Sequence, residues 1–238
     1  TTGTVTVTNA VAITGDHDQL TAALVTESTK VAVSDATVSI NDADATSITA
    51  TELAAIGAAT TGTVTVTNAV NIIGDHDEVT AALVTASTKV VVNGATVTIN
   101  DANATAITAT ELSAIGAATT GTVTVTNAVT ISGTTSELID ALITASSKVT
   151  ANTSNLTISD TPSTAQLYAL DDSTTGSITS GSGGGGSGGG SGNNNTITGT
   201  AAEVTPVSQI AEYEFEVCDL IKDLNDSYQT IVRKKSAA

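Results

Sequence analysis

The sequence contains no tryptophan and no methionine, and aromatic residues make up only 2% of its 238 residues. A compact globular core usually depends on large side chains of this kind. Hydrophobic residues still account for 40% of the chain and charged residues for 13%, which argues against general disorder. Alanine, valine, isoleucine, leucine and threonine must therefore fill the interior, and such small residues suit thin, regularly stacked layers.

Basic residues are also scarce, with 7 Lys and Arg against 24 Asp and Glu and a formal net charge of -17. This balance repels nucleic acid and anionic membranes, because phosphate binding needs basic side chains. It can attract divalent cations. No apolar stretch approaches the roughly 20 residues of a membrane span. We therefore expect neither nucleic-acid binding nor membrane insertion.

Cysteine occurs once, at Cys218, so no disulfide can form within the chain. This thiol could cross-link two chains or remain buried. No signal peptide and no initiator methionine are visible, and the chain opens in mid-pattern at Thr1. It is expected to be a processed product or a fragment of something larger.

An internal repeat dominates the sequence. The segment TTGTVTVTNAV begins at Thr1, Thr60 and Thr119, which gives a period of 59 residues. Each repeat contains two similar halves, and each half has two short runs of alternating residues followed by a helix-like run. Alternation predicts strands whose Val and Ile point inward and whose Thr point outward. In the first repeat the strand runs are Val5–Ala10, Val11–Ile13, Val31–Ala36 and Val38–Ile40, and the helix runs are Leu20–Val25 and Leu53–Ala59.

Helix starts are marked by a capping box, in which an N-cap residue and a Glu or Gln three places later satisfy each other's backbone donors. Gly57 and Gly116 are predicted to end two of the helices. Seven boxes in register predict seven strand–strand–helix coils. They are Asp16/Gln19, Thr49/Glu52, Asp75/Glu78, Thr108/Glu111, Thr134/Glu137, Ser163/Gln166 and Thr200/Glu203.

The predicted fold is an α/β repeat solenoid of stacked strand–strand–short-helix coils, because one coil cannot bury its apolar face alone. Residues 1–179 form this solenoid. Residues 180–195, rich in Gly, Ser and Asn, are a loop, a flexible linker or an engineered linker. Residues 196–238 hold a partial last coil and a C-terminal amphipathic helix, whose apolar residues recur at helical spacing and whose end is basic. This helix either caps the last coil or docks on another chain.

Candidate chemistry is confined to repeated elements. His17 and His76 each stand in Gly-Asp-His-Asp, which could bind metal or act as acid and base. The third repeat lacks both His and Asp but keeps the capping box, so a helix start explains the motif. Clustered oxygens make Asp42, Asp44 and Asp101 calcium candidates, although turn formation explains them equally well. No Ser/His/Asp constellation is present, and we expect no enzyme and no cofactor other than calcium.

The segments TAAEV (200–204) and TATELAAI (49–56), the latter followed closely by TTGTVTV, resemble repeats of very large secreted or cell-surface proteins of bacteria, including cyanobacteria. The resemblance covers about Thr1 to Val204 and not the tail. It implies an extracellular, structural or adhesive role and supplies no site residues.

The sequence thus favours a structural subunit of an extracellular filament or cell-surface fibre that polymerises head-to-tail with copies of itself. Solenoids normally end in polar caps, and the N-terminal end lacks one. An uncapped end exposes apolar side chains and strand edges, which attract another chain. The alternatives are a stalk segment of a giant bacterial adhesin and a calcium- or glycan-binding surface module. The residues expected at the contact are Thr1, Val5, Val7, Tyr213, Phe215, Leu220 and Leu224.

Overall fold

The computed structural model describes residues 5–28, 31–85, 87, 90–144, 146 and 148–180, and the backbone of 197–198. Contacts divide the chain into two units, Thr1–Thr200 and Ala201–Ala238, and all described residues belong to the first. The predicted C-terminal helix and the 181–195 segment lie outside the described residues.

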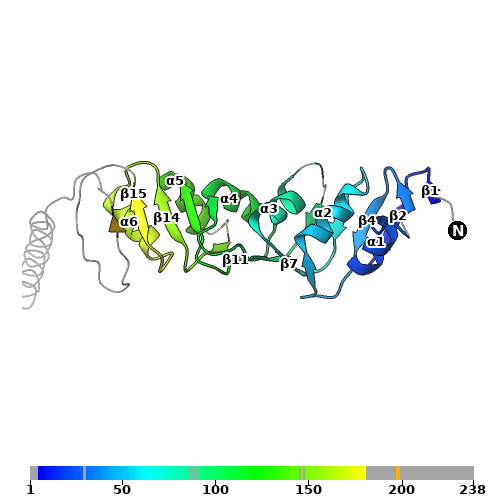
Figure 1. Ribbon diagram of the computed structural model, residues 1–238, viewed down its shortest axis with the longest axis horizontal. Coiled ribbons are helices and arrows are strands. Elements are labelled where there is room, and N and C mark those ends of the chain that lie inside the picture. Colours follow the sequence, from blue (N-terminus) through cyan, green and yellow to red (C-terminus); the bar gives the residue numbers. More distant parts are fainter. Residues whose placement is uncertain are drawn as a thin grey trace, which may run out of the picture. The chain divides into compact units, whose positions relative to one another are not determined.

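The first unit is an α/β repeat architecture, and its elements follow one another in chain order in Figure 1. We call the two halves of each repeat its first coil and its second coil. The first coils comprise β1 (Val5–Val7), β2 (Ala12–Gly15) and α1 (His17–Leu24); β6 (Val64–Val66), β7 (Asn71–Gly74), α3 (His76–Val79) and the π-helical η1 (Thr80–Val84); and β11 (Val123–Val125), β12 (Thr130–Gly133) and α5 (Thr135–Leu142).

The second coils have a related layout, which is longer by one strand in the first two repeats. They comprise β3 (Val31–Val33), β4 (Thr37–Ile40), β5 (Ser47–Thr49) and α2 (Ala50–Ala58); β8 (Val90–Val92), β9 (Thr96–Ile99), β10 (Ala106–Thr108) and α4 (Ala109–Ala118); and β13 (Val149–Thr150), β14 (Asn155–Ile158) and α6 (Thr164–Asp171). Strands β15 (Ile178–Ser180) and β16 (Ile197–Thr198) follow.

Two details differ from the sequence prediction. The second coils of the first two repeats contain a third strand, β5 or β10, directly before the helix. Each of these strands has only three residues and ends at the N-cap residue of the next helix, so the alternating pattern in the sequence is too short to reveal a strand. The prediction that Gly57 and Gly116 end helices is wrong, because both are buried inside α2 and α4, which continue past them.

All strand pairing is parallel and joins different coils. The sheet β5-β7-β9-β11-β13 takes β5 from the first repeat, β7 and β9 from the second, and β11 and β13 from the third. The sheet β10-β12-β14-β15-β16 begins one repeat later with the same order of strand types. Each five-stranded sheet therefore spans several successive repeats.

Each sheet runs obliquely across the coils, because its strands come from different positions in successive coils. This follows from the unequal number of strands in the two coils. Strands β1 and β2 pair with β3 and β4, whereas β6 and β7 pair with β4 and β5. Each three-stranded coil thus shifts the pairing by one strand, so that one sheet ends while another begins.

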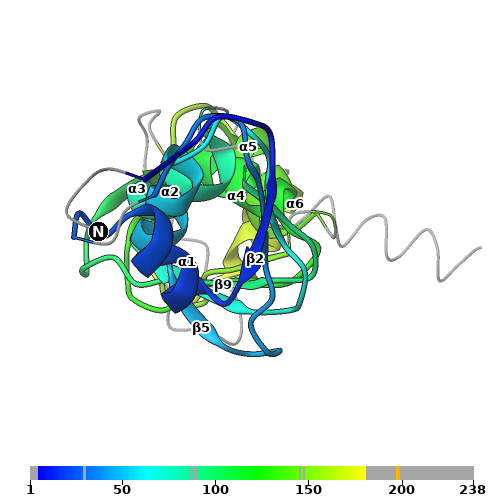
Figure 2. The same cartoon turned by 90° about the vertical axis from the view of Figure 1, so that its right-hand side faces the viewer.

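The core is aliphatic and repeats from coil to coil. Alternating residues of β6 and β11 are buried while the Thr between them is exposed, as predicted. The helices add Leu and Ile from one face, and each packs on the helix of the next coil. Figure 2 looks along this row of helices, so that successive helices lie one behind another. In the described part of the chain, no helix is both long enough and apolar enough to cross a membrane.

Six of the seven predicted capping boxes are confirmed, with both reciprocal hydrogen bonds present at each. The seventh, Thr200/Glu203, lies outside the described residues. The first N–H groups of a helix have no partner within the helix, and the capping box supplies one. Each box therefore determines the residue at which its short helix begins. This fixes where each coil turns from strand to helix.

A Thr-Thr-Gly motif fastens each new repeat to the coil before it. The buried Thr119 hydroxyl donates to the Ala95 carbonyl at 2.5 Å and accepts from the Gly121 N–H at 3.1 Å. A Cβ on Gly121 would lie 2.2 Å from the Ala95 oxygen, so only glycine permits this approach. The same contacts recur at Thr60 and Thr174.

We predict that Thr119→Val lowers the free energy of unfolding by about 1–3 kcal/mol, because the buried Ala95 carbonyl and the part-buried Gly121 N–H lose their partner. Thr119→Ser keeps the hydroxyl and is the matched control, with a smaller loss. Urea unfolding followed by circular dichroism measures both. Equal stability of the valine and serine variants would show that the hydroxyl does not stabilise the junction.

Candidate functional site

The most elaborate polar contact in the described residues joins the two coils of the first repeat. His17, the first residue of α1, places its ring Nδ1 2.6 Å from Oδ1 of Asp42, which follows β4 in the next coil. The backbone N–H of His17 donates to the other oxygen of Asp42 at 2.8 Å. The Asp42 carboxylate is only 5% exposed and therefore receives both bonds away from water.

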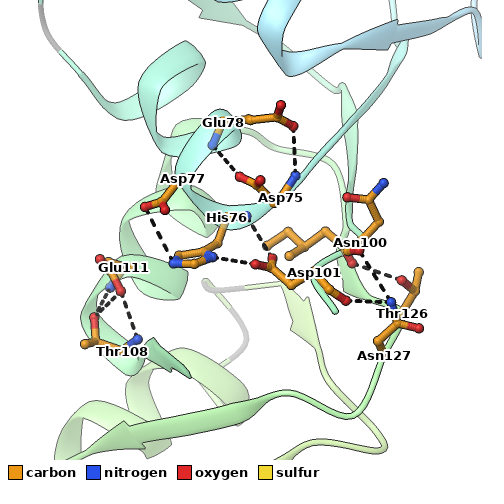
Figure 3. Close-up of polar contacts among 11 residues, drawn as sticks. Asp75, His76, Asp77, Glu78, Asn100, Asp101, Thr108, Glu111, Thr126 and Asn127 are labelled. Carbon is orange, nitrogen blue, oxygen red and sulfur yellow. Dashed lines mark hydrogen bonds and ion pairs between the residues drawn. The ribbon is translucent and has the colours of Figure 1, made fainter. Parts of the chain in front are cut away.

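The second repeat contains the same pair, drawn in Figure 3. His76 Nδ1 lies 2.7 Å from Asp101 Oδ1, and the His76 N–H donates to Asp101 Oδ2 at 2.8 Å. The loop that carries Asp101 is also held from the following coil, because the Asn127 side chain donates to the Asp101 carbonyl at 2.6 Å. Three successive coils therefore meet at this loop.

The third repeat shows what the aspartate does by itself. Thr135 occupies the histidine position and donates both its N–H, at 2.7 Å, and its hydroxyl, at 2.6 Å, to Asp160. The pKa of Asp160 is lowered mainly by the hydrogen bond from the Thr135 hydroxyl and, to a smaller extent, by the bond from the Thr135 N–H. The aspartate therefore serves the first N–H of the helix in all three repeats, and a histidine is not required for that task.

The other ring nitrogen of each histidine, Nε2, faces carboxylates. His17 Nε2 lies 3.7 Å from Asp18 Oδ1, and one ligand atom each of His17, Asp18 and Glu52 lies within 4.8 Å of the others. Glu52 comes from α2 of the next coil, where its carboxylate also closes the capping box with Thr49. These are the described residues best placed to hold a cation.

The second repeat has the same three residue types, but only in the first repeat do the ligand atoms all lie within 4.8 Å of one another among the described residues. His76 Nε2 lies 3.6 Å from Asp77, and Glu111 of α4 stands beside them on the side of the ring away from Asp101 (Figure 3). The charges of His76 and Glu111 act on each other's protonation.

These surroundings change the acidity of the histidines. Burial lowers the pKa of His17, but the hydrogen bond and charge of Asp42, together with the charges of Asp18 and Glu52, outweigh it and raise the pKa above the ordinary 6.5. Around His76 burial is outweighed in the same way, and its pKa is also raised.

The chemistry available to these pairs is limited by what faces Nε2. A histidine–aspartate dyad that activates a nucleophile needs a hydroxyl or thiol at that nitrogen. Among the described residues, the carboxylate of Asp18 lies beside Nε2 of His17, and that of Asp77 lies beside Nε2 of His76. The arrangement can hold a positive charge, either a proton on the ring or a bound cation.

The predicted calcium residues fasten coils together. Asp42 and Asp101 accept from the histidines, and Asp44 Oδ1 accepts from the Ala69 N–H at 3.0 Å. Calcium binding at these residues stays a prediction. Sequence reasoning treated the histidine and aspartate motifs separately, because the contact that joins them spans 25 residues and two coils.

The predicted assembly residues are only partly described. Val5 and Val7 form the ends of β1, with Val5 exposed and Val7 half-buried. The others, Thr1, Tyr213, Phe215, Leu220 and Leu224, lie outside the described residues.

Comparison with known proteins found no match among family models, curated proteins or solved structures.

We predict that the histidine pairs make stability depend on pH. Because folding raises the pKa of His17 and His76, their contribution is fully present below the unfolded value of about 6.5 and is lost as the pH rises through the folded-state values. His17→Thr combined with His76→Thr, which copies the third repeat, should flatten this dependence. Urea unfolding in metal-free buffer between about pH 5 and pH 8 measures it. A double variant as pH-dependent as the parent would contradict the prediction.

Proposed function

We propose that the stacked coils close into a solenoid and that the protein is a structural subunit of an extracellular filament or cell-surface fibre. Copies of the chain would join head-to-tail through the ends of the stack. The observation that carries this proposal is the uncovered first strand at the N-terminal end of the described residues.

The same short strand has different surroundings in the three repeats. Val5 of β1 is 45% exposed, whereas its counterparts Val64 in β6 and Val123 in β11 are 0% exposed. Ile13 of β2 is half-buried, and its counterpart Ile72 in β7 is fully buried. The sequence is that of an internal coil, and the difference is that no preceding coil lies against it among the described residues.

The neighbour that would fit can be inferred from the internal junctions. Strands β6 and β7 are covered by β4 and β5 of the preceding second coil. Among the described strands, β1 pairs only with β3 and β2 only with β4, which leaves one edge of each open. Open parallel edges next to apolar side chains favour the addition of further strands. A coil with strands like β4 and β5 would complete this end.

The Thr-Thr-Gly motif supports the same conclusion. At Thr60, Thr119 and Thr174 it binds a carbonyl of the preceding coil. The sequence Thr1-Thr2-Gly3 repeats the motif and lies outside the described residues. It would need such a carbonyl from another coil.

The head-to-tail contact would be heterologous and need not close, which gives an open filament rather than a ring. The partial last coil expected within residues 196–238, together with the tail residues Tyr213, Phe215, Leu220 and Leu224, is the proposed counterpart. The net charge of -17 suits a protein exposed to salt and would keep neighbouring filaments apart.

The alternative is a stalk segment of a giant adhesin, in which the covering coil belongs to the same polypeptide. The identity of the three TTGTVTVTNAV segments favours it, because none of them differs as a terminal cap would. Mass spectrometry of the native protein separates the two. A peptide that runs through Thr1 from a preceding segment supports the stalk, and a free Thr1 amine supports the subunit.

We predict that the purified chain forms rods of varied length in negative-stain micrographs and that Val5→Lys reduces them to single molecules. Lysine on an open edge strand is tolerated by the fold but disfavours a further strand. Thr65→Lys is the matched control, since Thr65 is exposed on β6, which is paired on both sides by β4 and β8, and its replacement adds the same charge. Short rods of one length in the parent protein would contradict self-assembly.

A further inference from the structure

Each histidine Nε2 and the two carboxylates beside it suggest a function that the fold does not need. We propose that His17, Asp18 and Glu52, and again His76, Asp77 and Glu111, form two sites for a divalent transition-metal ion of the Zn²⁺ type. Each ion would link the helix of a first coil to the helix of the following second coil.

The geometry of the first site fits one small cation. The three ligand atoms already lie within 4.8 Å of one another. Zinc binds nitrogen and oxygen ligands at about 2.0–2.2 Å, so small side-chain rotations suffice to close the site. The Asp18 side chain is 86% exposed and free to rotate, and it leaves water access to a fourth position.

The histidine is oriented as a metal ligand requires. Its Nδ1 donates to Asp42, so Nε2 carries the lone pair whenever the ring is neutral. Histidines that bind metals typically donate their other N–H to a carboxylate, which fixes the tautomer and makes the ligand more basic. Asp42 also binds the His17 N–H with its second oxygen, so ring and backbone are held together.

The repeats provide an internal comparison. The second repeat keeps all three ligand types, as His76, Asp77 and Glu111, around one ring in Figure 3. In the third repeat all three are replaced together, by Thr135, Ser136 and Gln166.

The structural tasks of the same positions survive these replacements. Asp160 still receives the first N–H of the helix, and Gln166 still closes its capping box with Ser163. What disappears from the third repeat is therefore only the set of groups able to bind a metal.

The donor set also selects the class of ion. Calcium and magnesium prefer oxygen ligands alone, whereas an imidazole with one or two carboxylates suits zinc and its neighbours. The site lies between two coils, so the ion would bind the folded stack and not the unfolded chain, and it would raise the stability of the stack.

The test uses the full chain with Cys218→Ser, which removes the one thiol that could bind zinc elsewhere. Titration of Zn²⁺ alone into metal-free protein, followed by calorimetry, should give two ions per chain and a higher melting temperature. Asp18→Asn with Asp77→Asn should weaken binding by at least about tenfold, a loss on the scale reported for disturbed metal sites. His17→Thr with His76→Thr should abolish it.

The matched control is Asp35→Asn with Asp140→Asn, which removes two exposed carboxylates elsewhere and should bind like the parent. The chain has only two histidines, so ring ¹⁵N spectra report on both sites directly. Zn²⁺ should shift the Nε2 signals and leave Nδ1 protonated, and Ca²⁺ should shift neither. Ring signals that respond to pH but not to Zn²⁺, or equal zinc binding by the histidine-to-threonine variant, would overturn the proposal.

Discussion

In the part of the chain that the structure describes, no coil can satisfy the hydrogen-bonding groups of its strands by itself. Every strand pairs with strands of other coils, and the buried polar side chains follow the same rule. Asp42 accepts from the coil before it, and Thr119 donates to the coil before it. Buried polar groups without partners are costly, so a coil is stable only beside a neighbour that supplies them. The fold, the open end and the polar contacts between helices all follow from this constraint.

Local patterns in the sequence predicted local structure well. The capping boxes placed six helix starts correctly, because each box depends on residues three positions apart. The alternation of Val and Thr identified β6 and β11 and their buried faces for the same reason. Both signals act within one turn or one strand.

Contacts between coils were not predictable in this way. The pairing of His17 with Asp42 joins residues from separate coils, and neither motif contains information about the other. Strand β5 escaped prediction because its three residues run directly into the capping residue Thr49. The oblique course of the sheets follows from that additional strand. The comparison of histidine with Thr135 became informative only once the shared aspartate acceptor was known.

The alternation of two-stranded and three-stranded coils in the first two repeats also determines how the gene could change in length. Loss of a single coil would place two coils of one kind together and disturb the pairing of every sheet that crosses the junction. Loss or gain of a whole 59-residue repeat would instead bring β4 and β5 against strands of the same pattern as β6 and β7. Recombination between neighbouring repeats of nearly identical sequence would therefore yield longer or shorter proteins without requiring any new interface.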